Sequence, residues 1–121
     1  LGAVNESRLY LKELLQNIVT NAIKYTQTGG VTVSVKRSAP RLLTFTVKDT
    51  GIGISRSDQQ HLFQKFWRSE DYRTRETGGT GLGLYVAQKL AKKLNTTIEL
   101  KSRLNHGSTF SFSLPSTKRR K

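Results

Sequence analysis

The spacing of apolar positions predicts two long amphipathic helices. Across residues 8–24, apolar side chains recur every three or four positions, and Ser7 is a suitable N-cap for this helix. The apolar residues that recur at helical spacing are Leu11, Leu14, Leu15, Ile18, Val19, Ala22 and Ile23. The second helix follows the glycines between residues 79 and 83, and its inward-facing positions are Leu84, Ala87, Leu90, Ala91 and Leu94. Asn95 is suited to cap its C-terminus.

Alternation with a period of two predicts four strands in two hairpins. Apolar and polar residues alternate over residues 31–36 and again over 43–48, and a turn near Pro40 joins these strands. A second hairpin is expected from residues 97–101 and 110–114, with its turn at residues 105–107. Each of the two long helices is therefore followed by a predicted hairpin of two strands.

The stretch between these segments predicts a short helix followed by a long loop. The short helix begins near residue 57 and places one group of apolar side chains on one side: Leu62, Phe63, Phe66 and Trp67. Residues 68–80 are polar and charged without periodicity, which is typical of a lid over a site. The order of elements predicts an α+β fold, a two-layer sandwich whose mixed, mostly antiparallel sheet is covered by helices on one face.

The composition is that of one globular domain. Of 121 residues, 35% are hydrophobic, which is enough for one core, and we expect a domain over residues 1–115 and a basic tail over 116–121. The absence of cysteine excludes disulfides and thiol nucleophiles and favours a reducing compartment such as the cytoplasm. No apolar run reaches the roughly 18 residues of a membrane span, so no membrane contact is expected. Because the chain begins at Leu1 and lacks methionine, we expect it to be part of a longer protein.

A formal net charge of +13 favours binding to polyanions without selecting one. One interpretation is therefore a basic nucleic-acid-binding module, which would bind DNA or RNA in a salt-dependent manner that ATP does not affect. Its aromatic residues, however, lie in apolar helical or strand patterns rather than on a stacking face, which makes nucleic acid the weaker interpretation.

Polar residues on the first helix and glycines before the second suggest a metal and phosphate site. Asn17, Asn21 and Lys24 fall within a stripe of about 60° beside the apolar arc. Magnesium prefers oxygen ligands and keeps several waters, so an amide oxygen and phosphate oxygens suffice. Glycines at 79, 81 and 83 would expose backbone N–H groups at a helix N-terminus, which suits phosphate. This spacing alone matches neither the dinucleotide fingerprint nor the P-loop.

The segment Asp49-Thr50-Gly51-Ile52-Gly53 leaves three interpretations open. An aspartate followed by glycines at a strand end is most often a turn. Asp-Thr-Gly also occurs in dimeric aspartic proteases of about this length, although the two long helices argue against an all-β protease. The third interpretation is a ligand site.

The joint order of the motifs resembles the catalytic ATP-binding domain of sensor histidine kinases. In chain order these motifs are Asn-x3-Asn-Ala-x-Lys-Tyr, Asp-x-Gly-x-Gly, Phe-x2-Phe, Gly-x-Gly-x-Gly and Gly-Ser-Thr-Phe, within residues 7–115. This domain belongs to a wider group, GHKL, that includes gyrase, heat-shock chaperone and mismatch-repair ATPases, and the resemblance implies its Bergerat-type ATP-binding fold. Ser7 stands where the family usually has an aspartate.

The resemblance also implies roles for individual residues. Asn21 would bind Mg²⁺ with Asn17 nearby, Lys24 would meet the phosphates of ATP, Tyr25 would pack near the adenine, and Asp49 would accept a hydrogen bond from the adenine amine. The remaining nucleotide contacts that it implies are Gly51, Gly53, Ile54, Phe66, Gly79, Thr80, Gly81, Leu82, Gly83 and Thr109, the last supporting Asp49 and its bound water. Phe63, Phe66 and Arg68 match the phenylalanine-box region, and Arg68 joins Asn17 and Lys24 as a residue with an expected catalytic role.

Asn17 favours a kinase over an ATPase. Hydrolysing relatives have a glutamate one helical turn before the magnesium asparagine, and an amide cannot accept a proton from water at neutral pH. The resemblance implies transfer of the γ-phosphoryl to a histidine on a separate domain of a homodimeric parent, and then to a response regulator. His61 and His106 lack the expected context of that acceptor. A related serine kinase or an ATPase remains the alternative.

Overall fold

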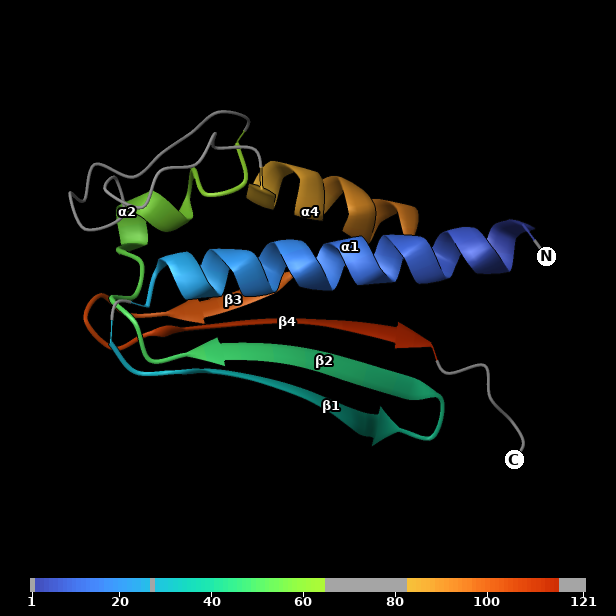
Figure 1. The fold of residues 1–121 in the computed structure, drawn as a ribbon, viewed down its shortest axis with the longest axis horizontal. Helices are drawn as coiled ribbons and strands as arrows, with labels where there is room; N and C mark the ends of the chain where they lie inside the picture. The colour runs from blue at the N-terminus through green and yellow to red at the C-terminus, as the bar shows by residue number, and fades with distance from the viewer. Residues whose placement is uncertain (1, 27, 65–82, 116–121) are drawn as a thin grey trace.

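The computed structural model describes residues 2–26, 28–64 and 83–115, and the side chains from residue 7 onward within these ranges. In chain order the elements are α1 (Gly2–Lys24), β1 (Val31–Ala39), β2 (Leu42–Asp49), α2 (Arg56–Gln59), α4 (Gly83–Lys93), β3 (Glu99–Ser102) and β4 (Ser108–Pro115). Figure 1 shows α1 and α4 side by side, forming a helical layer over one face of the sheet. The predicted α+β two-layer architecture is confirmed.

The four strands have the order β1-β2-β4-β3, and every pairing is antiparallel. The two central strands carry the aromatic part of the core, because Phe45 lies opposite Phe112 and Val47 lies opposite Phe110. The rings of Phe45 and Phe112 stack with centroids 5.1 Å apart. Both predicted hairpins, β1–β2 and β3–β4, are therefore present, and β2 pairs with β4 at the centre.

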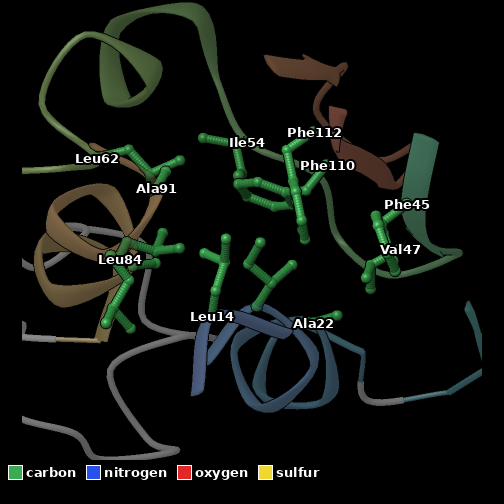
Figure 2. Packing of buried hydrophobic residues seen from close by; sticks show 13 residues of the cluster. Leu14, Ala22, Phe45, Val47, Ile54, Leu62, Leu84, Ala91, Phe110 and Phe112 are labelled. Carbon is green, nitrogen blue, oxygen red and sulfur yellow. The ribbon is translucent and has the colours of Figure 1, made fainter. Parts of the chain in front are cut away.

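The hydrophobic core lies between the helices and the central strands (Figure 2). From α1 it takes Leu14, Ile18 and Ala22, none of which has accessible surface. The other buried members are Phe45, Val47, Ile54, Leu62, Leu84, Ala87, Leu90, Ala91, Phe110 and Phe112. The helical stripes read from the sequence thus meet the inward-facing residues of β2 and β4.

Two helix starts differ from the predictions. α1 begins at Gly2, so Ser7 lies inside the helix and does not cap it. No proline stands between Gly2 and Ser7 to prevent the helix from extending backward. The short helix α2 is capped by Ser55, whose Oγ accepts a hydrogen bond from the Asp58 N–H at 3.2 Å. It ends at Gln59, before Leu62 and Phe63, while Phe66, Trp67 and the predicted lid lie outside the described residues.

One edge of the sandwich is open. Ile23 belongs to the apolar pattern of the first helix, but it is 59% exposed. Val33 and Val35 of β1 are about half exposed as well. β1 is the edge strand beside β2, and the core lies over β2 and β4, which leaves the apolar side of β1 without a full cover.

The C-terminus of α4 ends as the sequence predicts. Asn95 adopts the left-handed conformation with φ 60°. The Thr96 N–H bonds to the Ala91 carbonyl at 2.9 Å and the Asn95 N–H bonds to the Lys92 carbonyl at 3.0 Å, which is the Schellman arrangement.

Within the described ranges, no helix is both long enough and apolar enough to cross a bilayer.

Candidate nucleotide-binding site

Asp49, the last residue of β2, is a buried carboxylate with one unused oxygen. Only 2% of its surface is exposed. Its Oδ1 accepts a hydrogen bond from the Gly51 N–H at 2.9 Å, whereas the buried Oδ2 makes none within the described ranges. Burial raises the pKa of Asp49, and the backbone N–H groups of Gly51 and Ser108 partly oppose that rise. A buried acceptor without a donor is costly, so this oxygen is suited to a ligand that donates a hydrogen bond.

The loop after Asp49 is held closely against two other parts of the chain. The Ile52 N–H donates to the Tyr25 carbonyl at 3.0 Å, and a Cβ on Gly51 would lie 2.0 Å from that carbonyl oxygen. Gly53 has φ +73°, and a Cβ there would lie 2.0 Å from the Arg103 carbonyl oxygen. Both glycines are thus required by the close approach of the protein's own backbone, at the end of α1 and at the β3–β4 turn.

The residue of β4 that faces Asp49 is Ser108, which is not among the predicted site residues. Ser108 lies directly opposite Asp49 in the register and is 3% exposed. Thr109 lies opposite Lys48, and because neighbouring residues of a strand point to opposite faces, it lies on the other face of the sheet. The expected support of Asp49 by Thr109 is therefore wrong. The alternation with Phe110 and Phe112 was the signal that could have identified Ser108.

On α1, Asn21 also has a buried polar atom without a partner among the described residues. This atom is its Nδ2, and Asn17 and Lys24 are partly exposed on the same helix. Rotation of the Asn21 amide would place its oxygen where the nitrogen lies, so the residue fits a magnesium ligand. The described residues contain no group of three or more His, Cys, Asp or Glu side chains that could hold a metal ion. A magnesium ion here would need phosphate oxygens and water to complete its ligands.

The other predicted site residues are distributed around this centre. Ile54 is 3% exposed and belongs to the core, and Tyr25 and Phe63 pack against the core from its border. Gly83 is the first residue of α4. The remaining predicted residues Phe66, Arg68, Gly79, Thr80, Gly81 and Leu82 lie outside the described ranges.

The raised pKa of Asp49 predicts a pH-dependent contribution to stability. A carboxyl whose pKa is higher in the folded state than its usual 3.8 holds its proton more tightly when folded. Its stabilising contribution is therefore complete below pH 3.8 and is lost as the pH rises through the folded-state value. Urea unfolding at about pH 4 and about pH 7 measures the free energy of unfolding of wild type and of Asp49→Asn. Between these pH values, the free energy of unfolding of wild type should fall relative to that of Asp49→Asn. If the difference in the free energy of unfolding between the two proteins is the same at both pH values, the pKa of Asp49 is not raised by folding.

These features are a buried acceptor, a glycine loop and the end of an amide-bearing helix, which lie at one end of the sheet in an α+β sandwich. The chain belongs to the family described as histidine kinase-, DNA gyrase B-, and HSP90-like ATPases, whose model matches residues 6–118.

Among the proteins that this chain resembles are several sensor histidine kinases. The chain is 43% identical over 111 residues to the sensor histidine kinase RppB of Synechocystis. This match covers 92% of this chain and 24% of that protein. It is 40% identical over 108 residues to the histidine-protein kinase BarA of Escherichia coli, covering 86% of this chain and 12% of that protein. The chain thus spans about a quarter or less of these relatives' lengths.

The solved structures agree in fold. Full-length ShkA in complex with AMPPNP matches with a TM-score of 0.77 and 27% identity, over 92% of this chain and 22% of that one. The catalytic domain of histidine kinase ThkA matches with a TM-score of 0.72 and 26% identity, over 92% of this chain and 70% of that one. In sequence and in fold, the chain is thus similar to the ATP-binding catalytic domains of histidine kinases.

Proposed function

We propose that this domain binds Mg-ATP at the Asp49 end of the sheet and that its parent transfers the γ-phosphoryl group to a histidine on a separate domain. The observation that carries the proposal is the buried Asp49 Oδ2, which makes no hydrogen bond with any residue that the structure describes. It stands within a domain whose structural relative ShkA was solved with AMPPNP, an ATP analogue. The phosphorylated histidine would then supply a response regulator, and the parent would act as a homodimer.

In this proposal, the base is recognised at the end of β2. The exocyclic amine of adenine donates to Asp49, while the loop over residues 49–54 and Tyr25 border the ring. A carboxylate that accepts from the amine discriminates adenine from a base with a carbonyl in its place, because two acceptors would then face each other. Ser108 replaces Thr109 as the hydroxyl that supports Asp49.

The phosphates and their metal ion are assigned to the C-terminal half of α1 and the start of α4. Asn21 would hold Mg²⁺, which neutralises phosphate charge when bound, with Asn17 one turn away and Lys24 as a countercharge. Gly83 would present backbone N–H groups at the positive end of α4. By resemblance, Phe66, Arg68 and residues 79–82 complete this part of the proposed site.

Asn17 supports phosphoryl transfer over hydrolysis. An amide at this place does not deprotonate water, so the nucleotide is preserved for another nucleophile. His61 and His106 are both exposed, and His106 lies in the turn between β3 and β4, which is unlike the long helix expected for the acceptor. The proposed acceptor histidine therefore belongs to another domain of the parent.

Replacement of Asn21 by alanine tests the metal site. Wild type should bind a non-hydrolysable ATP analogue more tightly with Mg²⁺ than with EDTA in calorimetric titrations. Asn21→Ala should lose most of that difference, about tenfold in affinity, because one oxygen ligand is removed. Gln16→Ala, an exposed position on the same helix, is the matched control. An unchanged magnesium dependence in Asn21→Ala would remove this residue from the metal site.

A further inference from the structure

Asp49, Ser108 and Ser102 form a row across three neighbouring strands. In the register, Asp49 of β2 lies opposite Ser108 of β4, and Ser108 lies opposite Ser102 of β3. Residues paired in this way point to the same face, so all three side chains lie on the face that the helices cover. Ser102 on β3 is thus separated from Asp49 on β2 by strand β4, and the two side chains lie on the same face of the sheet.

Ser102 makes more hydrogen bonds than its place at the end of a four-residue strand requires. Its Oγ accepts from the Ile54 N–H at 2.8 Å and donates to the Gly107 carbonyl at 2.9 Å. It also lies 2.8 Å from the Ser108 Oγ. One hydroxyl therefore joins the loop after Asp49, the β3–β4 turn and the serine that faces Asp49.

The Ser102 backbone is fixed from the other side by α2. The Gln59 amide nitrogen donates to the Ser102 carbonyl at 3.2 Å and to the Ile54 carbonyl at 2.8 Å. Ser102 and Ile54 are thus linked twice, once through the Ser102 hydroxyl and once through the Gln59 amide. This double link makes Ser102 a rigid support rather than a freely rotating surface serine.

The hydrogen bonds of Ser102 determine the direction in which the Ser108 hydroxyl donates. A serine hydroxyl has one proton to donate. When Ser102 donates to the Gly107 carbonyl, the short contact between the two serines requires Ser108 to donate to Ser102. The Ser108 proton is then directed toward Ser102 on β3 and not toward Asp49 on β2. When Ser102 instead donates to Ser108, the Ser108 proton is available to the site.

We propose that Ser102 is a positioning residue for nucleotide recognition, which fixes the place and direction of the Ser108 hydroxyl beside Asp49. This inference rests on the proposed ATP site. Ser102 touches neither the base nor the phosphates in this proposal, and it acts through Ser108. Its removal leaves Ser108 free to rotate, so the hydroxyl must be ordered again each time a nucleotide binds.

The test is a double-mutant cycle on nucleotide affinity, measured by calorimetry with ADP and with a non-hydrolysable ATP analogue. Ser102→Ala should weaken both ligands equally, by about fivefold to tenfold, because the effect is at the base end. In a Ser108→Ala background, the same replacement should change affinity by less than about twofold. Ser102→Thr keeps the hydroxyl and should restore binding. Ser111→Ala, on the opposite face of β4, should bind as wild type does.

The outcomes separate the two proposals. If wild type binds neither nucleotide, the ATP site itself is wrong. If wild type binds and Ser102→Ala binds equally well, or if the two serine effects simply add, Ser102 does not act through Ser108. A loss in Ser102→Ala that Ser102→Thr does not restore would likewise overturn the inference, because a hydroxyl would then not be what the site requires.

Discussion

Asp49→Asn is expected to weaken ATP binding by about 1.5 to 3 kcal/mol, the size of a lost hydrogen bond to a charged group in a buried place. The replacement keeps the shape of the side chain and removes its charge. If the amide nitrogen takes the place of Oδ2, two donors face each other, the adenine amine and the Asn N–H. Calorimetric titration with an ATP analogue at constant magnesium measures the loss directly.

The fold should survive this replacement, which makes the binding result clear. Asp49 is a buried acid whose ionised form is disfavoured by burial, so neutralising it removes that cost. Glu99→Gln makes the same chemical change on an exposed residue of β3 and should leave affinity unchanged. Unchanged affinity in Asp49→Asn, with the fold intact, would place the base elsewhere.

Gly53→Ala is expected to lower the free energy of unfolding by about 2 to 4 kcal/mol. Two costs combine here, because φ is +73° and the new Cβ would lie 2.0 Å from the Arg103 carbonyl oxygen. That oxygen belongs to the backbone of the β3–β4 turn, so the contact cannot be relieved by turning a side chain. The loop would move away from the turn and shift Ile54 from the Ser102 hydroxyl.

Urea denaturation of Gly53→Ala beside Gly30→Ala measures this cost. A Cβ on Gly30 would meet no described residue within 4 Å, and its φ is not in the left-handed range, so that variant should differ from wild type by less than about 0.5 kcal/mol. Equal stabilities for the two variants would show that the loop does not need its close approach to Arg103.

The sequence predicts the fold well because the packed positions are periodic. The stripes on α1 and α4 and the alternation on β2 and β4 correctly identify most of the core. Alternation shows which residues share a face, but it does not show what covers that face. Val33 and Val35 alternate as regularly as Phe45 and Val47 do, yet they lie on the edge strand and remain about half exposed.

The site was only partly predictable, for a related reason. Asp49 and Asn21 could be selected because a polar residue beside an apolar run is conspicuous, and each has a buried atom without a partner in the described part of the chain. Alternation with Phe110 and Phe112 places Ser108 on the buried face, but nothing in the sequence shows that it lies beside Asp49 or that Ser102 lies beside it. Their importance comes from the register of β2, β4 and β3, which brings three segments distant in sequence into one row.

The strand order also determines when the site can exist during folding. The β1–β2 and β3–β4 hairpins need only local contacts and can close early, whereas the β2–β4 pairing joins the two halves of the chain and must overcome a larger loop entropy. Asp49 meets Ser108 only across that late pairing. If the β2–β4 pairing also forms after the transition state, a bound nucleotide will slow unfolding and leave the refolding rate nearly unchanged.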